Sequence, residues 1–221
     1  MAALLKDFAV SCHVADPERF LRLCDRFYEL LTAANGQMNL TRITSRAEFD
    51  VKHVIDSLAV ALSFPEFAEK PLRVADIGCG AGFPSVVLAA AFPQLRITAI
   101  DSTHKKIDFV ASAVRELGLD NLSPVAGRAV ELGRTKEYAG AFDVLTARAV
   151  ATAEKLRGEG RRMLAPGGRF ILYKTPGQLD ELEALATDRS MRWHATPAYE
   201  LPEGAGGRLF LVGARSGGKD V

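Results

Sequence analysis

From residue 72 onward, short apolar runs that are typical of buried strands alternate with longer segments of helical periodicity. Strands joined by crossover helices pair in parallel, so this alternation predicts an α/β fold with a mostly parallel sheet and helices on both faces. The predicted strands cover residues 72–77, 95–101, 123–127, 142–148, 168–174 and 207–215. The predicted helices between them cover residues 84–92, 105–118, 154–164 and 178–186.

The first 70 residues have a different pattern, with helical periodicity and no strand. A helix is predicted for residues 16–35, where Asp16 can cap the N-terminus and Gly36 suits the C-terminal end. A second helix is predicted for residues 45–64, which open on a capping-box pattern. The predicted organisation is a helical N-terminal extension (1–70) packed on a core domain (71–215), followed by a flexible tail (216–221).

Composition limits the class of protein. Hydrophobic residues make up 48% of the chain and charged residues 25%, as in globular proteins, and a net charge of +1 gives no overall basic field. Three cysteines without ligand spacing favour a reducing compartment and predict no metal site. The N-terminus lacks a signal-peptide pattern, and no apolar run is long enough to span a bilayer. We therefore expect a cytoplasmic protein, and a monomer.

A glycine-rich loop follows the first predicted strand, with Gly78, Gly80 and Gly82 spaced two apart. In open α/β sheets, ligands bind beyond the carboxyl ends of the strands, where this loop lies. The nicotinamide fingerprint needs a glycine at the sixth position, which is Phe83 here, and the P-loop ending Gly-Lys-Ser/Thr is absent. Neither dinucleotide nor nucleotide-phosphate binding fits the spacing.

S-adenosylmethionine fits this pattern better. Its methionine end needs close approach to the backbone, which glycines permit. Asp101 ends the next strand, and its carboxylate can accept hydrogen bonds from both ribose hydroxyls. The alternative is that the glycines only form a tight turn and that Asp101 only caps a helix.

The chain resembles a known family, the class I S-adenosylmethionine-dependent methyltransferases with a Rossmann-like fold. Within that class it is similar to the bacterial ribosomal small-subunit RNA guanine-N7 methyltransferases, also called the glucose-inhibited division protein B family. The resemblance covers nearly the whole chain. It rests on NLTRIT (39–44), KHVIDSL (52–58), ADIGCGAGFP (75–84), DSTHKKIDF (101–109), GRAVEL (127–132) and TARAV (146–150).

This resemblance implies a seven-stranded sheet and methyl transfer from S-adenosylmethionine to N7 of a guanine in 16S ribosomal RNA. It also implies that the partner is 16S RNA or the small ribosomal subunit, and that Arg148 faces both cofactor and base. Several family positions differ here: Ala34 replaces a tryptophan, the helix after the glycine loop starts differently at residues 84–88, Val130 replaces the usual acidic residue, and Thr175 replaces a glycine after Lys174. The implied cofactor-binding residues are Gly78, Gly80, Gly82, Phe83, Asp101, Ser102, Ala129, Val130 and Arg148.

The chemistry of guanine N7 requires no general base, because its ring-plane lone pair attacks without loss of a proton. The enzyme's task is then alignment, for which Arg148 suits guanine O6 or a phosphate. Adenine amino methylation is disfavoured, because the loop after residues 142–148 lacks the Asn/Asp-Pro-Pro-aromatic motif. Cytosine C5 methylation is disfavoured because Cys79, inside the glycine loop, is better placed as a small filler than as a nucleophile.

Two groups of residues remain as hypotheses. Asn39, His53 and Asp56 are predicted to form a lid over the cofactor, and Asn39 and His53 to act in catalysis with Arg148. The alternative is that His53 and Asp56 only pack. Three basic residues at strand or loop ends are predicted to contact RNA phosphates, namely Arg128, Lys174 and Arg208. A small-molecule methyltransferase and a non-catalytic cofactor-binding protein stay open as alternatives.

Overall fold

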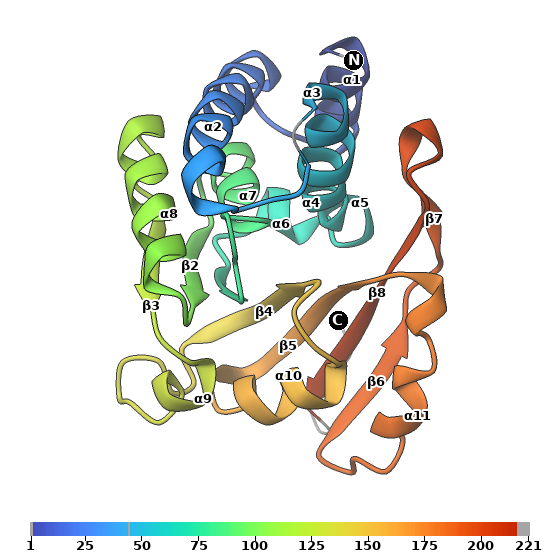
Figure 1. Ribbon diagram of the computed structural model, residues 1–221. Helices are drawn as coiled ribbons and strands as arrows, with labels where there is room; N and C mark the ends of the chain where they lie inside the picture. The colour runs from blue at the N-terminus through green and yellow to red at the C-terminus, as the bar shows by residue number, and fades with distance from the viewer. Residues whose placement is uncertain (1, 44, 216–221) are drawn as a thin grey trace.

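The computed structural model describes residues 2–43 and 45–215, so the predicted tail and Thr44 lie outside the described residues. One central sheet lies between two layers of helices (Figure 1). Its strands are β1 (Arg73–Ile77), β2 (Arg96–Asp101), β3 (Leu122–Ala126), β4 (Phe142–Arg148), β5 (Leu164–Lys174), β6 (Met191–Ala195), β7 (Tyr199–Glu200) and β8 (Gly207–Arg215).

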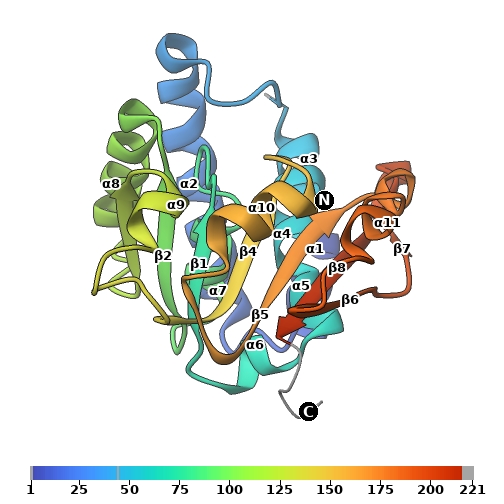
Figure 2. The same cartoon turned by 90° about the horizontal axis from the view of Figure 1, so that it is seen from below.

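The sheet has the order β3-β2-β1-β4-β5-β8-β6, and the two-residue β7 pairs with β8 outside this order. Strands β3, β2, β1, β4 and β5 are parallel, whereas β8 runs antiparallel to β5 and β6 (Figure 2). The seven strands in this order confirm the predicted mostly parallel sheet. Because the strand order reverses between β1 and β4, a crevice is expected beyond the carboxyl ends of these two strands.

The helices divide between the two faces of the sheet (Figure 1). One face carries the N-terminal helices together with α7 and α8, and the other carries α9, α10 and α11. The N-terminal elements are α1 (Ala2–Ser11), α2 (Pro17–Met38), α3 (Arg46–Glu48), η1 (Phe49–Ile55), α4 (Asp56–Leu58), α5 (Val60–Ser63) and α6 (Glu66–Glu69). The others are α7 (Ser85–Ala91), α8 (His104–Leu117), α9 (Ala129–Leu132), α10 (Ala153–Gly160), η2 (Pro176–Gln178), α11 (Glu181–Leu185) and η3 (Pro202–Gly204).

The expected end of α2 is wrong by three residues. The helix continues through Gly36 to Met38, and its C-cap is Asn39, whose left-handed backbone (φ 49°, ψ 50°) closes the last turn. The Asn39 amide donates to the Asn35 carbonyl at 3.1 Å. Gly36 therefore weakens the helix pattern without ending the helix. The helix ends instead at Asn39, because asparagine also tolerates the left-handed conformation of a C-cap.

Other elements also depart from the expectation, such as α10, which ends at Gly160 so that Leu164 already belongs to β5. The second helix begins after Ser45, whose hydroxyl accepts the Glu48 amide as predicted, but η1 within it is a π-helix. Such insertions occur often at functional sites. Strand β6 was not expected, although its apolar residues Met191 and Trp193 alternate with polar ones as in an edge strand.

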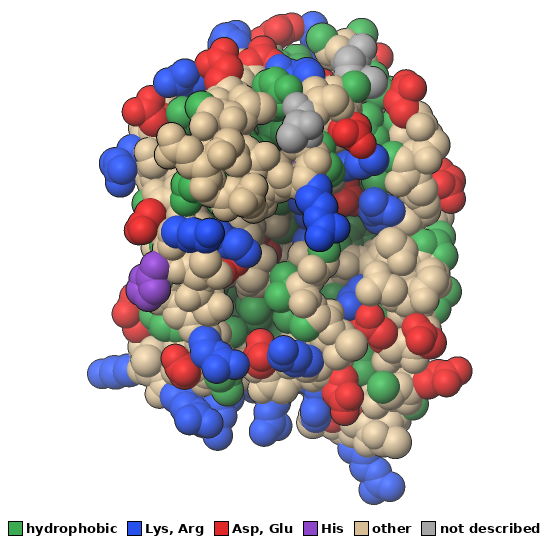
Figure 3. Space-filling model, in the orientation of Figure 1, with side chains coloured by type: hydrophobic (Ala, Val, Ile, Leu, Met, Phe, Trp, Pro, Cys, Tyr) green, Lys and Arg blue, Asp and Glu red, His purple; other side chains and the backbone are tan. Residues whose placement is uncertain are grey.

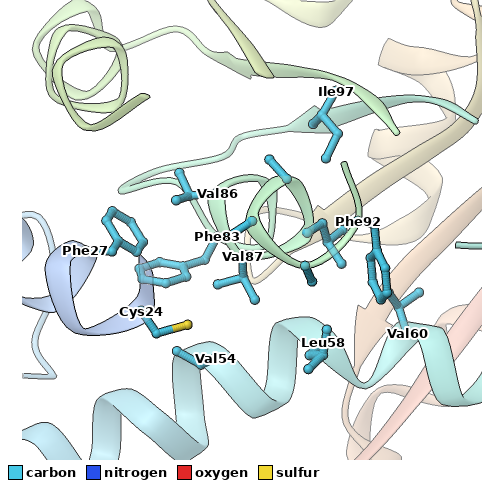
Figure 4. Close-up of a cluster of buried hydrophobic side chains, with 14 of the residues drawn as sticks. Cys24, Phe27, Val54, Leu58, Val60, Phe83, Val86, Val87, Phe92 and Ile97 are labelled. Carbon is cyan, nitrogen blue, oxygen red and sulfur yellow. The ribbon is translucent and has the colours of Figure 1, made fainter. Parts of the chain in front are cut away.

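The N-terminal helices share one hydrophobic core with the sheet. Phe27 of α2 lies 5.2 Å from the Phe83 ring, 6.2 Å from the Phe49 ring and 6.4 Å from the Phe109 ring, measured between centroids. Figure 4 shows Phe27 and Phe83 beside Val86 and Val87 of α7. Residues of the predicted extension and of the predicted core domain thus bury one another's side chains.

Because Phe27 joins α2 to the residue after the glycine loop, Phe27→Ala should lower the free energy of unfolding by about 3–5 kcal/mol. Urea unfolding followed by circular dichroism measures this change. Leu62→Ala is the control, since Leu62 is 46% exposed and its truncation should change stability by less than about 0.5 kcal/mol. Equal effects of the two substitutions would contradict the shared core.

Candidate functional site

A cleft of about 660 Å³ lies beyond the carboxyl ends of β1, β2, β4 and β5, where the topology places a ligand. Its size is within the roughly 300–1,000 Å³ of ligand sites. The glycine loop forms one wall, and residues from the N-terminal segment, the ends of β4 and β5 and the start of β8 form the others. Figure 3 shows the hollow in the middle of this face, with Lys and Arg side chains around it.

The glycine loop is shaped for close contact at one position. All three glycines have positive φ angles, of 74° at Gly78, 58° at Gly80 and 98° at Gly82. A Cβ atom on Gly78 would meet Val150 at 2.6 Å, and one on Gly82 would meet Val86 at 2.6 Å. A Cβ atom on Gly80 would meet nothing nearer than 4.0 Å. Packing thus explains two glycines, whereas Gly80 borders open space in the cleft, as a ligand-binding position would.

Asp101 lies beside this open position. One carboxylate oxygen accepts the Gly80 amide at 3.0 Å and the other accepts the Thr103 amide at 2.8 Å, while Lys106 Nζ lies 3.8 Å away. A carboxylate offers about four acceptor positions, so two remain for a ligand's hydroxyl groups. Asp101 lines the cleft and is 8% exposed, which suits a ribose-binding carboxylate.

Only some of the other predicted cofactor residues lie at the cleft. Gly78 and Phe83 line the cleft, whereas Gly82 packs behind it against Val86. Three of the predicted residues are not among those that line the cleft. Ser102 is exposed beside Asp101, and Ala129 and Val130 lie in α9. Adenine contacts by these residues stay a prediction.

Asp76 orders the loop from beneath. It is 1% exposed, and its carboxylate accepts hydrogen bonds from the Ser85 hydroxyl and, at 3.1 Å, from the Thr146 hydroxyl. Burial raises the pKa of Asp76 to about 6, although both hydroxyl groups oppose the shift. Since both partners are protein groups, Asp76 ties β1 to α7 and β4.

Arg148 occupies the opposite wall, at the end of β4. Its Nη1 donates to the Lys52 carbonyl at 2.9 Å and to Asp56 Oδ2 at 3.1 Å, and its Nη2 donates to His53 Nδ1 at 3.0 Å. Arg208 Nε binds the other oxygen of Asp56 at 3.1 Å. The N-terminal segment, β4 and β8 thus meet in one network, which brings together His53, Asp56, Arg148 and Arg208.

His53 is neutral in this network. Burial and, to a smaller degree, the Arg148 charge lower the pKa of His53 to about 3. Its ring stacks on Phe83, with centroids 4.1 Å apart and 8° between the planes, and the Arg148 guanidinium carbon lies 5.3 Å from the centre of the Phe83 ring. Phe83 thus joins the glycine loop to the opposite wall through ring contacts.

Two residues that sequence reasoning did not assign support His53. Thr41 Oγ1 lies 3.0 Å from His53 Nε2 and lines the cleft. Asn35 holds Thr41 through two hydrogen bonds, donating to its carbonyl at 3.0 Å and accepting from its amide at 2.9 Å. Asn39, which we expected over the cofactor, is exposed and is not among the residues that line the cleft. The motif NLT was the available signal, but its threonine lines the cleft rather than its asparagine.

The predicted basic rim is only partly exposed. Lys174 is 5% exposed, and its Nζ donates to Glu181 at 2.7 Å and to the Ala151 carbonyl at 2.9 Å, so its ammonium group is paired within the protein. Lys174 instead fixes the loop after β4 beside the cleft. Arg208 lines the cleft and binds Asp56, whereas Arg128 is exposed at the start of α9. RNA contacts by these residues stay a prediction.

Comparisons with known proteins agree with this geometry. A family model described as rRNA small subunit methyltransferase G (GidB) matches residues 21–208, which is most of the chain. The chain belongs to this family. Among its relatives, the ribosomal RNA small subunit methyltransferase G of Carboxydothermus hydrogenoformans is 37% identical over 96% of this chain and 90% of that protein. The protein of the same name from Lactococcus lactis is 36% identical over 88% of this chain and 83% of its own length.

Solved structures support the fold. An O-methyltransferase from Bacillus cereus, in complex with SAH, superposes with a TM-score of 0.59 at 15% identity, covering 87% of this chain and 91% of that one. A methyltransferase from Geobacter sulfurreducens gives a TM-score of 0.57 at 16% identity, covering 86% of this chain and 90% of that one. This GidB-family chain is therefore a methyltransferase with a Rossmann-like fold, and its cofactor is S-adenosylmethionine.

Within residues 2–43 and 45–215, no helix is long and apolar enough to cross a membrane. In the same residues, no group of three or more His, Cys, Asp or Glu side chains could hold a metal ion.

Because the pKa of Asp76 is raised in the folded state, its contribution to stability is present at low pH and is lost as the pH rises through about 6. Asp76→Asn does not titrate there. The stability of this variant relative to the native chain should therefore rise by roughly 3 kcal/mol between about pH 4 and pH 7. Urea unfolding across this range measures it, and a difference that does not vary with pH would contradict the raised pKa.

Proposed function

We propose that this protein transfers the methyl group of S-adenosylmethionine to N7 of a guanine in 16S ribosomal RNA, in the cytoplasm. The observation that carries the proposal is Arg148, which is held by three hydrogen bonds on the wall opposite the cofactor loop. A guanidinium has five N–H donors, so Arg148 retains donors for a purine or a phosphate. Family membership supports ribosomal RNA as the source of that purine.

The residues present fit the cofactor. Gly80 leaves space for close approach, and Asp101 retains acceptor positions for ribose hydroxyls. S-adenosylmethionine supplies a methyl group on a positively charged sulfur, so that the N7–methyl bond forms as the methyl–sulfur bond breaks and its electron pair stays on sulfur. The protein's contribution is to hold both partners in line and to exclude water.

The wall around Arg148 also fits a reaction without a base. Both oxygens of Asp56 bind arginines, and both ring nitrogens of His53 are engaged. Neither side chain is available to remove a proton from a substrate. Guanine N7 needs no deprotonation, whereas methylation of a hydroxyl group or a protonated amine does, so this wall favours the ring nitrogen.

Exposed cations around the cleft support a polyanionic substrate. Lys52 and Lys106 line the cleft with side chains that are 40% and 35% exposed, and the Arg42 side chain lies exposed nearby in the sequence. Lysine and arginine contacts with phosphates supply much of the affinity for RNA and make it depend on salt. A small-molecule acceptor would not require these charges.

Methyl transfer from labelled S-adenosylmethionine to unmodified 16S RNA and to small subunits, followed by digestion to nucleosides, tests the proposal. Label should appear as 7-methylguanosine. Arg148→Lys should lower the rate about 100-fold, because a lysine cannot replace the anchored fork. Arg96→Lys, at the opposite end of β2, is the control and should leave the rate within about twofold. Label on another nucleoside would refute N7 of guanine, and no label on either substrate would refute ribosomal RNA.

Cofactor binding gives a separate prediction. Asp101→Asn should weaken the binding of S-adenosylhomocysteine by about 10- to 100-fold, because hydrogen bonds to a charged group are lost. Isothermal titration calorimetry measures this change. Asp120→Asn changes an exposed carboxylate in the same manner and should leave affinity unaltered. Equal affinity of both variants would show that Asp101 does not hold the ribose.

A further inference from the structure

The hydrogen bonds around His53 fix the direction of every proton between Arg148 and Thr41. Arg148 can only donate, so its Nη2 donates to His53 Nδ1, which must carry no proton. A neutral imidazole then carries its proton on Nε2, and this N–H donates to Thr41 Oγ1 at 3.0 Å. The geometry thus determines the tautomer of His53.

Thr41 Oγ1 accepts a second hydrogen bond, from the Ile43 amide at 3.0 Å. A hydroxyl group has two acceptor positions and one donor, so both acceptor positions of Thr41 are filled. Within residues 2–43 and 45–215, no acceptor is recorded for the Thr41 O–H, and this residue lines the cleft. The Thr41 hydroxyl can therefore offer a ligand only a hydrogen-bond donor.

The neighbouring side chains have the same polarity. Both oxygens of Asp56 and the Nδ1 atom of His53 are occupied by arginine donors, as is the Lys52 carbonyl. Among the described residues, the Nε–H of Arg148 has no recorded acceptor. At Thr41 and Arg148 this wall thus presents donors to the cleft, while Asp56, His53 Nδ1 and the Lys52 carbonyl each already accept arginine hydrogen bonds.

We propose that Thr41 is a specificity-determining residue of the methyl-acceptor site, where its hydroxyl donates to the purine carbonyl O6 next to N7. The inference rests on the proposed function and extends it from reaction to base selection. Guanine presents two acceptors, N7 and O6, on this edge, whereas adenine presents an amino donor in place of O6. A fixed donor at this position favours guanine. With adenine, the Thr41 hydroxyl would face the adenine amino group, so that two donors would meet without an acceptor. N7 itself stays free for the methyl group.

The test compares two purines in two forms of the enzyme. The guanosine that the native enzyme methylates is first mapped, and small subunits are then prepared with 2-aminopurine riboside at that position, which keeps N7 and lacks O6. The native enzyme should favour guanosine by about 10- to 100-fold in kcat/KM, the range expected for one buried hydrogen bond. Thr41→Val should methylate guanosine more slowly and lose most of this preference.

A merely structural role of Thr41 gives a different result. If valine only displaced His53 and Arg148, both purines would slow equally and the preference for guanosine would persist, which would overturn the proposal. Thr41→Ser keeps the hydroxyl and should keep the preference. Thr32→Val, on the exposed side of α2, is the matched control and should also keep it.

Two further outcomes are distinguishable. Calorimetry should give the same affinity for S-adenosylhomocysteine in Thr41→Val and in the native enzyme. Weaker cofactor binding combined with a persistent preference would assign Thr41 to the cofactor and overturn the proposal. If the native enzyme forms no 7-methylguanosine, the proposed function itself fails, independently of Thr41.

Discussion

The buried carboxylate of Asp56, bound by Arg148 on one oxygen and by Arg208 on the other, is the interaction on which the site depends. Asp56 belongs to the N-terminal segment, Arg148 ends β4 and Arg208 begins β8, so one side chain joins three regions that are distant in sequence. Buried charges are stable only when they are paired and hydrogen-bonded. The N-terminal helices are therefore part of the site and not an accessory to it.

This pairing leaves an excess of positive charge on the wall, because two guanidinium groups share one carboxylate. Burial and, to a smaller degree, the Arg148 charge lower the pKa of His53, which stays neutral and serves as an acceptor for Arg148. Phe83 extends the arrangement across the cleft by stacking on His53. The cleft thus has the glycine loop, proposed to hold the cofactor, on one wall and the donors proposed to hold the base on the opposite wall.

The features that could be predicted from the sequence are those that depend on local residue patterns. Alternation of strands and helices predicted the sheet, and the glycine spacing with Asp101 predicted where the cleft lies. Gly80 beside Asp101 agrees with this reading, because among the three glycines of the loop it is the one that borders open space. The family resemblance, carried by motifs such as NLTRIT and TARAV, is confirmed by the comparisons.

Long-range pairing could not be predicted in this way. The local sequence suggests that Lys174 is exposed, because it does not reveal that the Lys174 ammonium group pairs with Glu181 on the far side of η2. The π-helix η1 and the link from Asn35 through Thr41 to His53 arise from tertiary packing around a short loop. Strand β6 was missed although its alternation was present, because a five-residue edge strand gives a weak signal.

The tautomer of His53 is the central claim that a single measurement tests most directly. Nitrogen-15 NMR of labelled protein, with His53 assigned by comparison with His53→Gln, reports which ring nitrogen carries the proton. The account predicts a proton on Nε2, none on Nδ1, and no titration between about pH 5 and pH 8, because the pKa lies near 3. A proton on Nδ1, or a titration near the ordinary histidine pKa, would contradict the network that holds Arg148 and orients Thr41.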